Sequence, residues 1–112
     1  MLVSPDADSL TETFERVLTM TNYANLVPEF EELFRQKLKL NNCRLVKKRQ
    51  ENNYQITTPA KDIFLMSWQE FPEVNLIYQP VGVRTEQTLV YERAIRSHLN
   101  FCLSSIQDKV LS

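Results

Sequence analysis

A chain of 112 residues that is 43% hydrophobic and 24% charged has the composition of an ordinary globular domain with one core. No apolar run reaches the roughly 18 residues that a membrane span needs, and the first residues lack the pattern of a signal peptide, so we expect a cytoplasmic protein. Two cysteines are too few for a disulfide framework, and the single glycine excludes glycine-rich phosphate loops.

The chain is predicted to begin with a flexible arm, residues 1–8, followed by a single domain, residues 9–112. The stretch Ser9 to Glu12 fits a capping box, in which the serine hydroxyl and the glutamate carboxylate satisfy free amides at a helix start. Apolar side chains follow it at helical spacing. A short first helix is therefore predicted, ending near residues 21–23.

A second helix is predicted from about Pro28, whose fixed φ suits a first turn. Acidic residues gather at its start and basic residues at its end, as the helix dipole favours. The pair Asn41 and Asn42 is its expected end. Its inner face is expected to consist of Phe30, Leu33, Phe34 and Leu38.

Beyond Cys43 the pattern changes to that of β-strands. Residues 44–49 and 54–58 flank an amide-rich turn and are predicted to form a hairpin. Residues 63–68 and 74–79 are predicted as the third and fourth strands. The third strand is apolar at nearly every position, so we expect it to lie centrally with both faces covered.

One alternative stays open between residues 60 and 71. Thr58 could cap a helix there with Pro59 in its first turn, and periodicity does not separate a helix from a strand over so short a run. We predict the strand, because residues 54–58 need a partner and four-residue turns join hairpins well.

A long helix over residues 85–111 is predicted to close the chain. Gly82 is expected to allow the bend before it, and Thr85 to cap its first turn. At 100° per residue, its apolar side chains cover about 200° of arc, so it must be covered from two sides or by a partner molecule. The predicted fold class is α+β: two N-terminal helices, a four-stranded antiparallel meander and a long C-terminal helix packed on the sheet.

Groups able to catalyse a reaction or bind a metal are few. His98 and Cys102 lie four residues apart on one helix face, a spacing at which an imidazole could activate a thiol. Both lie within the apolar stripe, where core packing is the better interpretation. A zinc site built from Cys43 and these two residues lacks a usual fourth ligand. We therefore predict no enzyme activity, no catalytic residues, no cofactor and no metal.

Charge is unevenly distributed, although the formal net charge is only −1. Residues 1–34 carry seven acidic residues and one basic residue, whereas residues 35–50 carry seven basic residues and no acidic one. The bases around the first strand either protect a sheet edge from unwanted pairing or form a patch for a polyanion. That patch would consist of Arg44, Lys47, Lys48 and Arg49.

Apolar side chains in excess of one core are the stronger functional lead. They lie along the last helix and at the turn before the fourth strand: Phe101, Leu103, Ala94, Phe71 and Val74. We predict an interaction module, such as an adaptor, assembly factor or complex subunit, that binds another protein through the C-terminal helix or a strand edge. A homodimer would bury the apolar stripe against its own copy. The alternatives are nucleic-acid or polyanion binding by residues 35–49 and cysteine-dependent catalysis.

Overall fold

A computed structural model describes residues 23–80 and 82–111, so the predicted arm and first helix lie outside the described residues. The strands pair in the order β1-β2-β3-β4, and each neighbouring pair is antiparallel. The predicted α+β meander is confirmed, including a strand rather than a helix between residues 60 and 71. The elements in chain order are α2 (Val27–Lys39), β1 (Arg44–Lys47), β2 (Asn53–Thr57), β3 (Ile63–Trp68), β4 (Val74–Gln79) and α3 (Glu86–Leu111).

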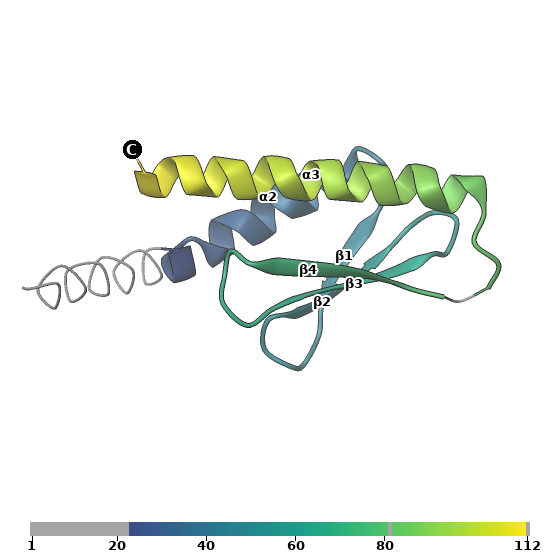
Figure 1. Cartoon of the computed structure of the whole chain (residues 1–112), viewed down its shortest axis with the longest axis horizontal. Helices are drawn as coiled ribbons and strands as arrows, with labels where there is room; N and C mark the ends of the chain where they lie inside the picture. Colours follow the sequence, from purple (N-terminus) through teal and green to yellow (C-terminus); the bar gives the residue numbers. More distant parts are fainter. Residues whose placement is uncertain (1–22, 81, 112) are drawn as a thin grey trace, which may run out of the picture.

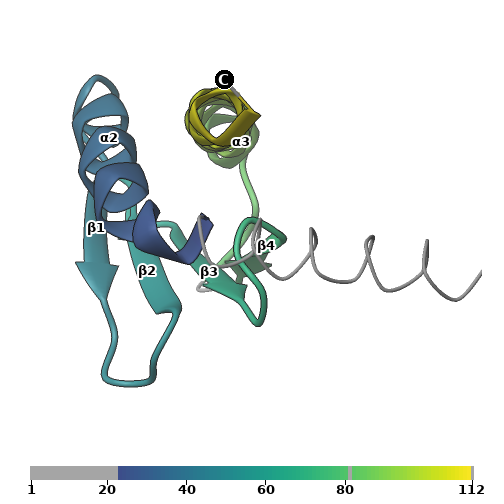
Figure 2. The same cartoon turned by 90° about the vertical axis from the view of Figure 1, so that its left-hand side faces the viewer.

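Both helices lie on one face of the sheet (Figure 1). Figure 2 shows α2 above β1 and β2, and α3 above β3 and β4. Buried and part-exposed residues alternate along β2 and β3, which is typical of a sheet with one covered face.

The expectation that β3 has both faces covered is wrong. The strand lies between β2 and β4 as predicted, but Ile63, Leu65 and Ser67 are part-exposed on the face opposite the helices. Leu65 is paired with Gln55 on one side and Ile77 on the other, so neighbouring strands shield it in the plane of the sheet. A strand flanked on both sides can thus be apolar on both faces without a second layer of helices.

Helix α2 follows the predicted pattern closely. It has a proline in its first turn, basic residues in its last turn, and an inner face of Phe30, Phe34 and Leu38 that is fully buried. Beyond Lys39, Asn42 adopts a left-handed backbone with φ 58°, a conformation that asparagine tolerates better than most residues. The chain then turns directly into β1.

The core between α2 and the sheet is aromatic. The ring of Phe30 lies 6.0 Å from that of Trp68 and 5.1 Å from that of Phe71, both edge-on. Tyr54 stacks on Trp68 with ring centroids 5.1 Å apart. Burying each such ring contributes about 1.5–3 kcal/mol. The aromatic cluster therefore holds α2 on the hairpin.

The start of α3 is anchored by a buried polar network. The predicted cap at Thr85 is confirmed: its hydroxyl accepts from the amide of Thr88 at 3.2 Å, and the Thr88 hydroxyl accepts from the Thr85 amide at 3.2 Å. The Thr88 hydroxyl also donates to the buried carboxylate of Asp62 at 2.9 Å. Thr58 donates to the other oxygen of that carboxylate at 3.2 Å. The network ties α3 to the β2–β3 turn.

Gly82 does not play the role expected of it. No glycine of the described residues has a positive φ, and a Cβ added at Gly82 would meet nothing within 4 Å. The bend before α3 therefore does not depend on the conformational freedom of glycine.

Helices α2 and α3 run antiparallel. Lys109 near the end of α3 bonds Glu29 near the start of α2 at 2.7 Å, and His98 lies 2.7 Å from Asn41 just beyond the end of α2. The broad apolar stripe of α3 is thus covered from two sides, by α2 and by the sheet. No helix of the described residues is long and apolar enough to cross a membrane.

Candidate functional site

The two edges of the sheet differ sharply in charge. The β1 edge carries Arg44 and Lys47 within the strand, and Lys48 and Arg49 follow it. Lysines and arginines at such positions discourage pairing with another strand. The β4 edge, Val74–Gln79, carries no charged residue over six positions. The protected edge and the unprotected edge lie at opposite ends of the same sheet.

The β4 strand also exposes apolar surface. Ile77 lies on the open face of the sheet and is 60% exposed. On the helix side, Leu89 of α3 is 41% exposed and lies two turns before Arg96 on the same helix flank. Arg96 donates to the backbone oxygen of Leu76 at 3.4 Å, which places this flank beside β4. We call the following six residues the β4 edge surface: Leu76, Ile77, Tyr78, Leu89, Glu92 and Arg96.

Charges of both signs border this surface on the helix side. Glu92 bonds the guanidinium of Arg84, and its Oε1 lies 3.8 Å from Arg96. The Arg84 guanidinium lies 5.2 Å from the centroid of the Tyr78 ring. The rim of the β4 edge surface therefore offers both an acid and bases to a docking chain.

The apolar residues predicted to form an interface are dispersed. Phe71 is buried in the aromatic core, and Leu103 and Val74 are partly buried against the core. Ala94 is part-exposed. Phe101 is 51% exposed on the flank nearest α2, where the Lys37 ammonium lies 4.5 Å from its ring centroid. The packing of α2 thus covers much of the apolar surface that the sequence pattern predicted to be available to a partner protein.

The predicted basic patch is divided into two parts. Lys47 lies 3.5 Å from Glu31, while Lys48 and Arg49 are exposed at the far end of β1. Arg44, at the near end, lies beside Arg35 and Lys39, two bases that α2 contributes to the predicted 35–49 segment. A hollow of about 330 Å³ is lined there by Arg35, Lys39, Cys43, Arg44 and Leu45.

The structure gives His98 and Cys102 the environments of packed residues. Cys102 is fully buried, and burial raises the pKa of its thiol to about 11, so the thiol is protonated at neutral pH. Burial, with a smaller effect from Lys37, lowers the pKa of His98. Its Nε2 pairs with the side-chain oxygen of Asn41 at 2.7 Å. Both Cys43 and Cys102 are free and buried.

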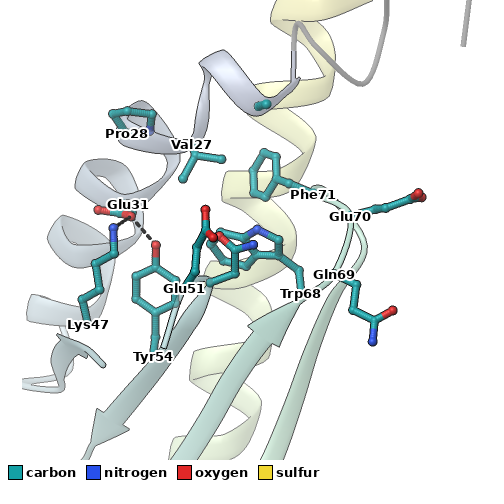
Figure 3. Close-up of a pocket in the computed structure, with 12 residues that line it drawn as sticks. Val27, Pro28, Glu31, Lys47, Glu51, Tyr54, Trp68, Gln69, Glu70 and Phe71 are labelled. Carbon is teal, nitrogen blue, oxygen red and sulfur yellow. Dashed lines mark hydrogen bonds and ion pairs between the residues drawn. The ribbon is translucent and has the colours of Figure 1, made fainter. Parts of the chain in front are cut away.

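Sequence reasoning missed a cavity of about 580 Å³ at the start of α2 (Figure 3). It lies between α2, the β1–β2 turn and the β3–β4 turn. Its floor is the stacked pair Tyr54 and Trp68, with Phe71 edge-on to Trp68 at 5.2 Å. Its wall carries Glu31 from α2 and Lys47 from β1. These residues lie far apart in sequence, so no local pattern could have indicated the cavity.

Two polar groups converge on one oxygen of Glu31 in this wall. The Tyr54 hydroxyl donates to Glu31 Oε1, and Lys47 Nζ lies 3.5 Å from the same atom. Burial, followed by the bond to Glu31, raises the pKa of the Tyr54 phenol well above its usual range. Tyr54 is therefore a neutral donor here at physiological pH.

Comparisons with protein-family models, with curated proteins and with solved structures found no match for this chain.

Proposed function

We propose that the protein is a non-enzymatic interaction module that pairs with another polypeptide through the free edge of β4. The observation that carries the proposal is the contrast between the two edges: β1 is rich in bases, whereas β4 is uncharged and exposes Ile77. An edge strand presents unpaired amides and carbonyls along one side, and an added strand satisfies them.

The edge is favoured over the C-terminal helix as the docking element. The apolar stripe of α3 is largely used by α2 and the sheet, and its exposed Phe101 lies against Lys37. The flank of α3 beside β4 instead adds Leu89 and the Glu92–Arg96 pair to the strand edge. A chain docked on β4 would contact this flank as well, which enlarges the buried area beyond that of a single strand.

A second copy of this chain is the partner that this surface fits best. Ile77 lies near the middle of β4, so a two-fold axis beside it would pair the two β4 strands antiparallel and bring the two Ile77 side chains together. Glu92 and Arg96 lie one turn apart on α3. The same two-fold axis would therefore bring Glu92 of each copy opposite Arg96 of the other.

The test compares charges placed on the two edges. Ile77→Lys should convert a dimer to a monomer in sedimentation velocity, because a lysine on the free edge opposes pairing. Val46→Lys is the matched control, since Val46 is 40% exposed on the same face of the sheet but lies on β1. Association that is equally lost in both variants, or retained in both, would contradict the proposal. If the wild type is a monomer and captures a different protein, and Ile77→Lys abolishes that capture, the partner at the β4 edge is that protein and not a second copy of this chain.

A second candidate function, polyanion binding, has its own supporting observation. Arg35, Lys39 and Arg44 line one hollow, and none of the described residues that line it is acidic. A phosphate-bearing polymer bound there would lose affinity steeply with added salt. Charge reversal at Lys39 and Arg44 should abolish retention on an oligonucleotide column, whereas charge reversal at Lys48 and Arg49 should leave most of it. Absence of retention by the wild type at low salt would exclude this function.

A further inference from the structure

The cavity at the start of α2 contains a hydrogen-bond donor that the fold leaves unused. Trp68 is 6% exposed and lines the cavity. Within the described residues its indole N–H has no hydrogen-bond partner, and it is not sealed away from open space. Tryptophan N–H groups usually find a partner when they are buried. The floor of the cavity therefore offers a donor to whatever enters it.

The same cavity contains an unused acceptor. Both donors that reach Glu31 converge on Oε1, and Oε2 has no donor among residues 23–80 and 82–111. The Glu31 side chain is 18% exposed, so this oxygen is held near the cavity wall with limited access to water. A cationic donor placed against it would form a charge-assisted hydrogen bond.

The charges around the cavity favour a cation over an anion. Among the described residues that line the cavity, Lys47 is the single base, against the carboxylates of Glu31, Glu51 and Glu70. Figure 3 shows the Glu51 carboxylate turned into the space above Trp68, whereas Glu70 points away from the cavity. The carboxylates of Glu31, from α2, and Glu51, from the β1–β2 turn, thus both border the cavity, and among the described residues Lys47 pairs with Glu31.

We propose that this cavity binds an arginine side chain of another polypeptide, with its guanidinium between Glu31 and Glu51 and a carbonyl of the same peptide on the indole N–H of Trp68. A guanidinium is planar and weakly hydrated, and it offers several donors at once, so it suits a narrow space with an aromatic floor and two carboxylates better than an ammonium does. The amide side chains of Asn52 and Gln69 belong to the same lining and are available to the peptide backbone. This inference is independent of the β4 edge, which lies on a different part of the molecule.

Trp68 makes the test direct, because it is the single tryptophan of the chain and it lines this cavity. The probe is an acetylated and amidated Gly-Arg-Gly tripeptide, titrated to about 10 mM so that weak, millimolar binding is detected. We expect a saturable change in emission that the matched Gly-Gln-Gly tripeptide does not produce. Added salt should weaken the binding, since the contact is charged.

Three variants locate the binding. Glu51→Gln should weaken it about tenfold, as should Glu31→Gln, because each removes one charge-assisted contact. Glu51 is exposed, so Glu51→Gln should not disturb the fold. It therefore tests the proposal even where Glu31→Gln destabilises the protein. Glu86→Gln, an equal charge change in the first turn of α3, should leave the affinity unchanged.

The outcomes separate the alternatives. Equal responses to the arginine and glutamine tripeptides, or equal effects of the Glu51 and Glu86 variants, would overturn the proposal. Methylguanidine that binds as tightly as the tripeptide would also overturn it, because the cavity would then be a site for a small cation rather than for a polypeptide. Ile77→Lys should bind the arginine tripeptide like the wild type, so failure at the β4 edge and failure at this cavity are distinguishable.

Discussion

The anchoring of α3 can be tested by removing one hydroxyl group, with Thr88→Val. The Thr88 side chain is 1% exposed, and its hydroxyl is the donor to Asp62 Oδ1 and the acceptor from the Thr85 amide. Valine keeps the shape of threonine but can make neither bond. The substitution removes the donor that lies 2.9 Å from Asp62 Oδ1, and no other residue of the described ranges donates to that oxygen.

The expected cost follows from these two contacts. A hydrogen bond to a charged group contributes about 1.5–3 kcal/mol, and the lost contact at the helix start adds about 0.5–1 kcal/mol. Thr88→Val should therefore lower the free energy of unfolding by about 2–4 kcal/mol, out of a total of about 5–15 kcal/mol for a domain. At about 4 °C per kcal/mol, Tm should fall by roughly 8–16 °C.

Urea unfolding followed by Trp68 fluorescence and circular dichroism measures this change. Thr88→Ser is the matched control, because it keeps the hydroxyl and loses one methyl group, at a cost of about 1 kcal/mol. In an Asp62→Ala background, Thr88→Val should cost less than it does alone, since the carboxylate is already absent. Similar costs for the valine and serine variants would refute the argument, as would additive costs in the double variant.

Other predictions follow from single groups. Because burial lowers the pKa of His98, the unfolded chain binds a proton that the folded chain does not, so the free energy of unfolding should fall as the pH drops below about 6.5. His98→Gln should flatten that slope in urea titrations between about pH 5.5 and 7. Cys102, with a thiol pKa of about 11, should resist iodoacetamide in the native protein and react after unfolding; rapid native alkylation would revive the cysteine-enzyme hypothesis. Gly82→Ala should raise stability by about 0.4–1 kcal/mol, because its φ is ordinary and the added Cβ meets nothing; a loss in thermal unfolding would contradict this. Phe101→Asp, on the flank of α3 near α2, should leave self-association intact in sedimentation, whereas its loss would place the contact on the helix instead of β4.

The sequence predicted the elements well wherever local chemistry determines them. The ends of α2 follow from Pro28 and from an asparagine that adopts a left-handed backbone, and the start of α3 from the hydroxyl of Thr85. Periodicity could not decide between a strand and a helix for residues 60–71, because a short apolar run fits both. The pairing of β3 with β2 and β4 decided it, and pairing is a tertiary contact.

The functional surfaces were predicted less completely. A strand edge was among the expected docking elements, and the predicted meander already placed the basic first strand at one edge. The exposure of Ile77 beside a flank of α3 was not predicted, because it depends on where α3 packs on the sheet. The apolar width of α3 was recognised, yet the share of it that α2 covers depends on where the two helices meet, at contacts such as those of His98 and Lys109.

What the sequence determined by itself was the identity and order of the described elements, because capping residues, turn residues and hydrophobic period act over a few neighbouring positions. Only the tertiary structure decided which surfaces remain open. The cavity joins Glu31, Lys47, Glu51 and Trp68 from separate segments. Within the described part of the chain, Glu31 Oε2 and the Trp68 indole N–H have no hydrogen-bond partner, because neighbouring side chains turn elsewhere. Whether a polar group has a partner depends on the three-dimensional placement of residues that the chain holds far apart.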